Sequence, residues 1–150
     1  MNNNDAEILL VEDNMDYAAL TIRALKKVNL ANKLVHLEDG QQALDFLFSK
    51  GAFENRELTR QPKVILLDIK MPKVDGIEVL RQIKTNEATR MIPVVIMTSS
   101  NEEQDMIASY NLGVNSYVVK PVHFESFAKA VSELGLYWLL TNRPPNTTLF

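Results

Sequence analysis

Polar side chains that could do chemistry stand directly after four apolar runs of the sequence. They are Glu12 and Asp13 after the first run, Asp68 after the second, Thr98 after the third and Lys120 after the fourth. Each of them alone has a structural explanation, such as a helix cap at Glu12 and Asp13 or a solvated surface lysine at Lys120. Acids, a hydroxyl and an amine at four separate segment ends point instead to one shared site.

The chemistry of such a site follows from its charges. Carboxylates that lie close together repel one another, so an acidic cluster needs a cation. Mg²⁺ suits this cluster, because it prefers oxygen ligands and usually takes one or two carboxylates together with a phosphate. Lys120 would add a fixed positive charge and Thr98 a hydroxyl donor for phosphoryl oxygens. These residue types predict a phosphoryl-transfer site that uses Mg²⁺.

Five short segments are predicted strands, and they would have to position these residues. Four are unbroken apolar runs, which is typical of strands buried on both faces of a parallel sheet. The fifth is weaker and contains His36, which we interpret as a sheet residue without a metal-type partner. The segments are 8–11, 34–37, 64–67, 94–97 and 117–119.

Helical patterns alternate with the predicted strands. Four of them show apolar residues three or four apart, which predicts a buried stripe on each. The helix before the last strand is less regular; we expect it to begin near Asn101, to hold Glu102 and Glu103 in its first turn and to end at Gly113. The four stripes are Met15, Ala18, Ala19, Ile22, Leu25 and Val28; Ala43, Leu44, Leu47 and Phe48; Ile77, Leu80 and Ile83; and Phe124, Phe127, Ala128, Val131 and Leu134.

This alternation predicts an α/β fold with a doubly wound, five-stranded parallel sheet and helices on both faces. Ligands of such sheets bind outside the carboxyl ends of the strands, which is where the acids, Thr98 and Lys120 would meet. The polar connection 49–62 is longer than is usual between a helix and a strand, so we interpret it as a loop or a partner surface.

Composition narrows the class of protein further. The 150 residues suit one domain, and a formal net charge of −3 provides no broad basic surface for nucleic acid. The absence of cysteine excludes disulfides and thiolate metal sites. Because no apolar run approaches the length of a signal peptide or a membrane span, we expect a soluble cytoplasmic protein without a membrane partner.

Residues 7–134 resemble the response-regulator receiver family through four motifs, which occur in the family's order. Residues 1–6, which precede this domain, are expected to be disordered. The motifs are ILLVEDN at 8–14, LLDIKMPKVDG at 66–76, MTSS at 97–100 and YVVKP at 117–121. The resemblance implies the flavodoxin-like, CheY-like strand order 2-1-3-4-5. It also implies a phosphorelay protein whose Asp68 accepts a phosphoryl group from the phosphohistidine of a sensor histidine kinase.

The resemblance also implies the roles of individual residues around the phosphoacceptor. Asp13, Asp68 and the backbone carbonyl of Lys70 would bind Mg²⁺ directly, and Glu12 would act through a coordinated water. Lys120 would bridge to the phosphoryl group, and Pro121 would shape the turn that aims it through a cis peptide bond.

Switching would follow from the same resemblance. Thr98 would move toward the phosphoryl group and pull Ser99 and Ser100 with it, and Tyr117 would then turn inward. Lys70 and Ser100 would flank the water that attacks the phosphoryl group, and so influence how long the group survives.

Two other functions compete with this interpretation. A phosphohydrolase of the haloacid-dehalogenase type would need a second acid two residues after its nucleophile, where this chain has Lys70. A receiver that serves only as a docking module would be marked by a missing Asp, Thr or Lys. All three are present here, so this alternative holds only if no kinase recognises the surface. A nucleotide-binding domain is disfavoured, because neither a P-loop nor a G-x-G-x-x-G motif occurs.

The segment 135–150 is expected to extend the last helix and end in a tail after Arg143-Pro144-Pro145. Its apolar residues 136–140 either pack back on the domain or pair two chains. By resemblance to the family we favour a homodimer through the last two helices, the last strand and the tail. The 49–62 loop and Tyr137-Trp138 also resemble single-domain regulators that serve bacterial phytochrome kinases, many of them cyanobacterial.

Overall fold

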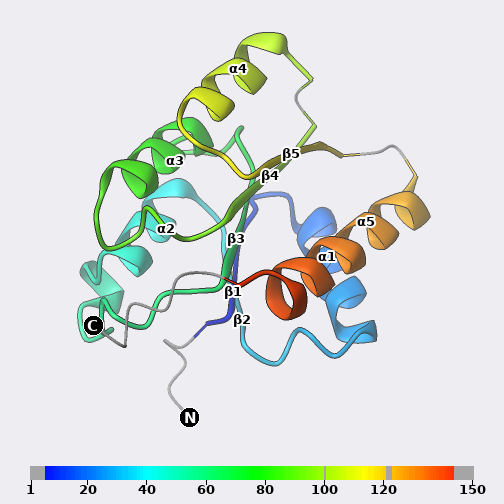
Figure 1. Cartoon of the computed structure of the whole chain (residues 1–150), viewed down its shortest axis with the longest axis horizontal. Coiled ribbons are helices and arrows are strands. Elements are labelled where there is room, and N and C mark those ends of the chain that lie inside the picture. Colours follow the sequence, from blue (N-terminus) through cyan, green and yellow to red (C-terminus); the bar gives the residue numbers. More distant parts are fainter. Residues whose placement is uncertain (1–5, 100, 121–122, 144–150) are drawn as a thin grey trace.

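The computed structural model describes residues 6–99, 101–120 and 123–143 (Figure 1). Its five strands form one parallel sheet in the order β2-β1-β3-β4-β5. The predicted fold class and strand order are therefore confirmed. The strands are β1 (Ile8–Val11), β2 (Leu34–Leu37), β3 (Val64–Leu67), β4 (Val94–Thr98) and β5 (Ser116–Val119), within one residue of the predicted segments.

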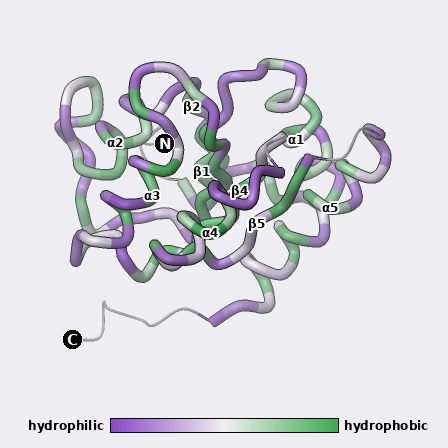
Figure 2. The backbone as a smooth tube through the Cα atoms, turned by 90° about the horizontal axis from the view of Figure 1, so that it is seen from above, coloured by the Kyte–Doolittle hydropathy of each residue, from purple (hydrophilic) through white to green (hydrophobic). Residues whose placement is uncertain are grey.

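Helices cover both faces of the sheet (Figure 1). On one face lie α1 (Met15–Lys27) and α5 (Phe124–Leu136), and on the other lie α2 (Gly40–Leu47), α3 (Gly76–Thr85) and α4 (Glu103–Asn111). Successive strand residues point to opposite faces, so Ile8 and Leu10 join the core under α1 and α5 while Leu9 and Val11 join the other core. Figure 2 shows the resulting hydrophobic strands at the centre of the molecule.

The stripe predicted for α1 is partly wrong. Met15 and Ala19 are exposed, and the buried residues of this helix are Ala18, Thr21, Ala24 and Leu25. The buried face of α1 is rotated from the predicted stripe because it includes Thr21. The burial of Thr21 is possible because its hydroxyl donates to the carbonyl of Tyr17 at 2.8 Å. The sequence pattern counted only apolar residues and so missed a polar one whose hydrogen bond is made inside the helix.

The fourth helix begins later than predicted. α4 starts at Glu103, and Glu102 is its N-cap rather than a first-turn residue. It ends at Asn111, two residues before Gly113, whose φ of +93° lies in the region that favours glycine. Its buried face is narrow, since Ile107 and Tyr110 are both more than half exposed.

The connection 49–62 is a loop with a short 3₁₀ helix (Gly51–Phe53), organised around a buried arginine. The guanidinium of Arg56 lies 4.0 Å from the centre of the Phe46 ring. Its Nη2 donates to the carbonyl of Arg60 and to Gln61 Oε1, both at 2.9 Å. The apolar and polar partners of one side chain thus hold the loop against α2.

After Leu136 the chain continues in a π-helical turn (Tyr137–Thr141). Trp138 and Leu139 pack back onto the core under α1 and α5, whereas Tyr137 and Leu140 are half exposed or more. Of the two arrangements expected for residues 136–140, packing back on the domain therefore applies to Trp138 and Leu139.

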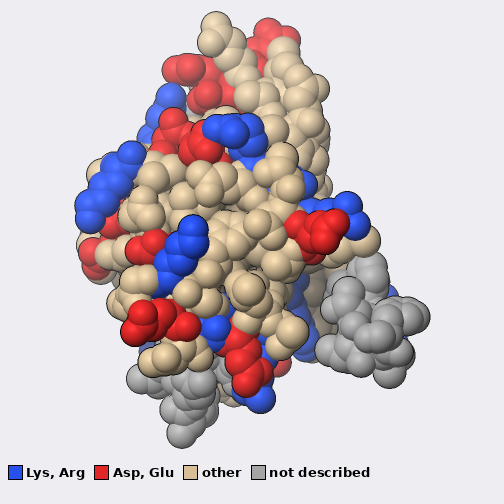
Figure 3. Space-filling view, turned by 90° about the vertical axis from the view of Figure 1, so that its left-hand side faces the viewer, with Lys and Arg blue, Asp and Glu red and all other residues tan. Residues whose placement is uncertain are grey.

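Charges of both signs lie on the surface of the protein. Basic and acidic side chains alternate over the face that carries α2 and α3, without a large patch of either sign (Figure 3). Within the described residues, no helix combines the length and apolar character that crossing a membrane requires.

Candidate functional site

The sheet register brings the predicted site residues to one edge. Val11 pairs with Leu67, so Glu12 and Asp68 leave neighbouring strands at the same level. The backbone hydrogen bonds between β1 and β3 extend to Asp68, because its amide donates to the carbonyl of Val11 at 3.1 Å. At the same edge, beyond the end of β5, the amide of Lys120 donates to the carbonyl of Thr98 at 2.7 Å.

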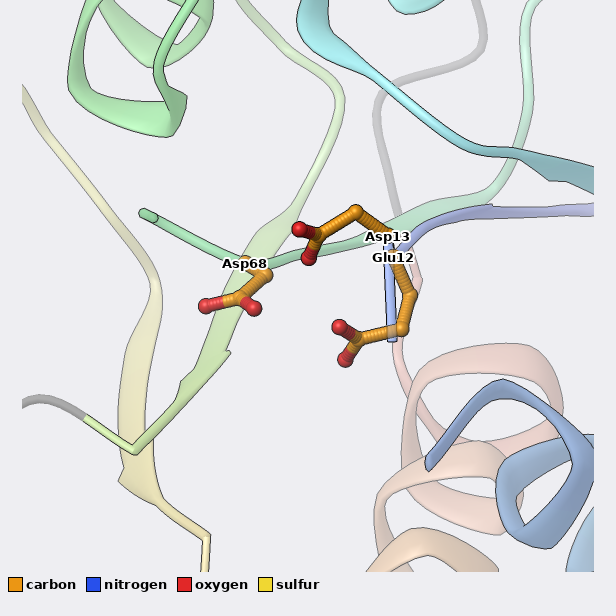
Figure 4. A group of neighbouring side chains, drawn as sticks. All are labelled: Glu12, Asp13 and Asp68. Carbon is orange, nitrogen blue, oxygen red and sulfur yellow. The ribbon is translucent and has the colours of Figure 1, made fainter. Parts of the chain in front are cut away.

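Three carboxylates gather at this edge (Figure 4). Glu12, Asp13 and Asp68 each offer one oxygen, and these oxygens all lie within 4.8 Å of one another. Glu12 and Asp68 are buried, while Asp13 is exposed and opens the cluster to solvent. These oxygens could hold one hard divalent cation, which would leave further coordination positions to water or to a phosphoryl oxygen.

Lys120 lies inside this cluster. Its Nζ is 2.5 Å from Glu12 Oε1 and 3.3 Å from Asp68 Oδ2. The side chains of Lys120, Glu12 and Asp68 are only 3%, 4% and 7% exposed. Little water is available to screen these charges, so the ammonium compensates two carboxylates at short range.

The pKa of Glu12 shows that its buried carboxylate is only partly compensated by Lys120. Burial raises the pKa of Glu12 to about 7 from an ordinary value of 4.5. The hydrogen bond and charge of Lys120 lower the pKa, the negative charge of Asp68 raises it, and the amide of Asn14 lowers it by donating to the carboxylate. The raised value shows that desolvation exceeds the compensation by Lys120, so an additional cation would be favourable here.

The position of Asp68 depends on the loop that follows it. Its Oδ1 accepts a hydrogen bond from the amide of Ile69 at 2.7 Å, and the other oxygen faces Lys120. Gly76, the first residue of α3, lies so close that a Cβ there would be 2.1 Å from the carbonyl oxygen of Asp68. The amide of Gly76 donates to the carbonyl of Ile69 at 2.7 Å, which fixes the helix against the strand end.

The other predicted residues lie around this centre. Thr98 is the last residue of β4 and is fully buried, and Ser99 after it is exposed. Tyr117 pairs with Ile96 and packs, partly buried, against the core under α2, α3 and α4. The ammonium of Lys70 lies 3.7 Å from Asp105 of α4. Ser100 and Pro121 lie outside the described residues.

Three contacts at the site were not predicted from the sequence. Asn14, rather than Glu12 or Asp13, caps α1: its Oδ1 accepts from the amides of Asp16 and Tyr17. His36 Nε2 lies 2.8 Å from the carbonyl oxygen of Glu12. An asparagine directly before a helix was a readable cap signal, whereas the His36 contact joins two strands and depends on their pairing.

The third contact involves Tyr17. Its ring centre lies 4.3 Å from Lys120 Nζ. Because the two residues are more than a hundred positions apart in the chain, no local pattern could have paired them.

Comparisons with known proteins agree with this geometry. The profile of the family described as "Response regulator receiver domain" matches residues 8–132. The chain is 45% identical over 139 residues to the probable methanogenesis regulatory protein FilR2 of Methanothrix harundinacea, a match that covers 92% of this chain and 86% of FilR2. It is 42% identical over 134 residues to the response regulator Rcp1 of Synechocystis, with 89% of each chain covered.

Solved structures extend the likeness to three dimensions. The Mn²⁺-bound form of Rcp1 superposes with a TM-score of 0.85 at 41% identity, covering 93% of this chain and 98% of Rcp1. The phosphorylated cyanobacterial phytochrome response regulator RcpA gives a TM-score of 0.87 at 34% identity, covering 95% and 99%. With the four sequence motifs, the strand order and the acidic cluster, these matches show that the chain belongs to the response regulator receiver domain family and is a response regulator of two-component signalling.

Proposed function

We propose that Asp68 is the phosphoacceptor of this response regulator and takes its phosphoryl group from a sensor histidine kinase in the cytoplasm. The observation that carries the proposal is the convergence of three carboxylates and one buried ammonium at the end of β1 and β3. In the transfer, a carboxylate oxygen of Asp68 forms a bond to phosphorus while the bond from phosphorus to the kinase imidazole breaks. The product is an acyl phosphate, whose hydrolysis returns the carboxylate.

The charges at the site favour Mg²⁺ as its cation. Glu12, Asp13 and Asp68 offer only oxygen atoms, and three carboxylates with one ammonium leave a net charge of −2 when all are ionised. Asp13 and Asp68, with the carbonyl of Lys70, would hold the ion, and Glu12 would bind one of its waters. When bound, Mg²⁺ neutralises charge on the phosphoryl oxygens in the loose transition state.

The protein's own residues then orient the phosphoryl group and respond to it. The ammonium of Lys120 already faces Asp68 and would pair with a phosphoryl oxygen, and the hydroxyl of Thr98 would donate to another. A shift of Thr98 with Ser99 and Ser100 would change the space beside Tyr117, which then turns inward. Lys70 and Ser100 would stand at the path of the hydrolytic water.

Small-molecule phosphorylation tests the proposal without a kinase. Purified protein is incubated with acetyl phosphate and Mg²⁺ and followed by intact mass and phosphate-affinity gel. We expect one phosphoryl adduct that requires Mg²⁺, is lost in Asp68→Asn and persists in Asp16→Asn, an exposed acid on α1. Failure of the folded wild-type protein to form the adduct would leave a docking module as the function.

We infer that a phytochrome-type histidine kinase is the partner. The inference is supported by the likeness of 95% of this chain to the cyanobacterial phytochrome response regulator RcpA. Phosphotransfer from purified, autophosphorylated kinases tests it, with a bacterial phytochrome kinase beside a kinase that has no photosensory domain. The expected result is faster transfer from the phytochrome kinase, and equal or slower transfer from it contradicts the inference.

We further propose a homodimer through α4, β5, α5 and the segment after it. Each of these elements exposes a large apolar side chain: Tyr110 on α4, Val119 on β5, Leu136 on α5 and Leu140 in the π-helical turn. Light scattering should show a dimer in the wild-type protein and a monomer in Leu140→Asp. Leu58→Asp, which changes an exposed leucine of the 49–62 loop, should remain dimeric.

A further inference from the structure

Lys120 has an aromatic partner besides its two carboxylates. The centre of the Tyr17 ring lies 4.3 Å from Lys120 Nζ, within the range of a cation–π interaction. The lysine side chain is almost completely buried, and such an interaction is stronger where the cation is shielded from water. The ammonium is therefore held from two directions, by Glu12 and Asp68 and by the ring.

The ring is itself fixed from two helices. Tyr17 lies in the first turn of α1, where its amide donates to Asn14 Oδ1 at 3.1 Å and its carbonyl accepts from the hydroxyl of Thr21. The ring also meets Phe127 of α5 edge to face, with ring centres 5.1 Å apart and an interplanar angle of 74°. Phe127 is 1% exposed, so its own position is set by the core.

We propose that Tyr17 is a positioning residue, whose ring face keeps the Lys120 ammonium beside Asp68 when a bound cation weakens the attraction of the carboxylates. The proposal rests on the phosphoacceptor role of Asp68. Before phosphorylation, a bound divalent cation draws charge from Glu12 and Asp68. This weakens the attraction between Lys120 and the acids, but it does not change the quadrupole of the Tyr17 ring.

A structural role for Tyr17 would give a different result. If the ring only filled space between α1 and α5, any apolar side chain of similar size would serve. If it positions Lys120, the replacement must have an electron-rich face. Tyr17→Leu, Tyr17→Phe and Tyr17→pentafluorophenylalanine separate these cases, because the last keeps the shape of the ring and reverses its quadrupole.

The first readout is the rate of phosphorylation by acetyl phosphate at saturating Mg²⁺. Loss of a shielded cation–π contact corresponds to a fall in rate on the order of tenfold in Tyr17→Leu. We expect a similar fall in the pentafluorinated variant and a restored rate in Tyr17→Phe. Phe48→Leu is the matched control, since Phe48 is the C-cap of α2 and packs, partly buried, against the core on the other face of the sheet.

The second readout is the chemical shift of the Lys120 ε-methylene group, measured with ¹³C-labelled lysine and assigned with Lys120→Met. A proton above an aromatic face is shifted upfield, so this signal should be shifted in the wild type and in Tyr17→Phe and should move toward the random-coil value in Tyr17→Leu. The measurement needs no phosphorylation. It therefore tests the placement of Lys120 even if Asp68 proves not to be a phosphoacceptor.

Each outcome decides the proposal. Slower phosphorylation in the leucine and pentafluorinated variants, with restoration by phenylalanine, supports it. A wild-type rate in the pentafluorinated variant overturns it, and so does a slow Tyr17→Leu whose lysine signal keeps its wild-type shift. If Tyr17→Leu fails to fold, the pentafluorinated and phenylalanine variants still give the comparison, because both fill the volume of the ring.

Discussion

The ammonium of Lys120 lies closer to Glu12 than to Asp68, with its Nζ 2.5 Å from Glu12 Oε1 and 3.3 Å from Asp68 Oδ2. The acid that holds the lysine most closely is thus not the proposed phosphoacceptor. Asp68 keeps one oxygen on the amide of Ile69 and the other in looser contact with Lys120. This division compensates two buried carboxylates with one ammonium and leaves Asp68 available for reaction.

Replacing Lys120 by methionine should destabilise the protein in the absence of divalent cations. Glu12 and Asp68 would then share a buried site without the ammonium that compensates them. We expect this to lower the free energy of unfolding by about 3 kcal/mol. Urea denaturation in EDTA measures this loss, and Mg²⁺ should recover much of it. Lys129→Met, at an exposed position of α5, should have little effect in either condition. Equal losses in both variants would contradict the charge argument.

The titration of Glu12 should make stability depend on pH. Its pKa in the folded protein is raised to about 7 from 4.5, so the folded state binds the proton more tightly than the unfolded chain. This contribution to the free energy of unfolding is fully present below pH 4.5 and is lost as the pH rises to about 7.

Glu12→Gln removes the titration, so its stability relative to the wild type in EDTA should rise over that pH interval. Urea denaturation at several pH values measures the difference, with Glu87→Gln, at an exposed position, as the control. A difference between wild type and Glu12→Gln that does not change with pH would argue against the raised pKa.

Gly76→Ala should disturb the site through the backbone. The new Cβ would stand 2.1 Å from the carbonyl oxygen of Asp68, which cannot move aside as a side chain can. We expect a loss of more than about 2 kcal/mol in the free energy of unfolding and slower phosphorylation of Asp68. At Gly135 a Cβ would meet the end of the Leu25 side chain at 2.6 Å, so Gly135→Ala should cost less and leave phosphorylation unchanged.

Arg56→Ala should open the 49–62 loop and leave the site intact. It removes the contact with Phe46 and two hydrogen bonds to the end of the loop. We expect their loss to lower the free energy of unfolding by about 2 kcal/mol. Faster hydrogen exchange should appear in this loop, with phosphorylation of Asp68 unchanged. Arg60→Ala, whose side chain is 57% exposed and pairs with Glu57, should exchange like the wild type. Unchanged exchange in Arg56→Ala would show that the loop is held elsewhere.

Most of the site was predictable because it is built on local signals repeated along the chain. Four strands are apolar runs, and each run is followed directly by a candidate site residue, so the order of residue types together with a parallel sheet places Glu12, Asp13, Asp68 and Lys120 at one sheet edge. The stripe of α1 was less predictable. Thr21 is buried through a hydrogen bond within its own helix, and a count of apolar residues does not register that bond.

The sequence alone determined the strands, their parallel arrangement and the acids that gather at their ends, since all of these follow from runs of residue types and from the handedness of crossover connections. Only the tertiary structure decided which carboxylate holds Lys120, that Tyr17 lies against the same ammonium, and that Gly76 touches the backbone of Asp68. These relationships join segments far apart in the chain. They depend on distances of a few ångströms between packed elements, which the pattern of residue types does not encode.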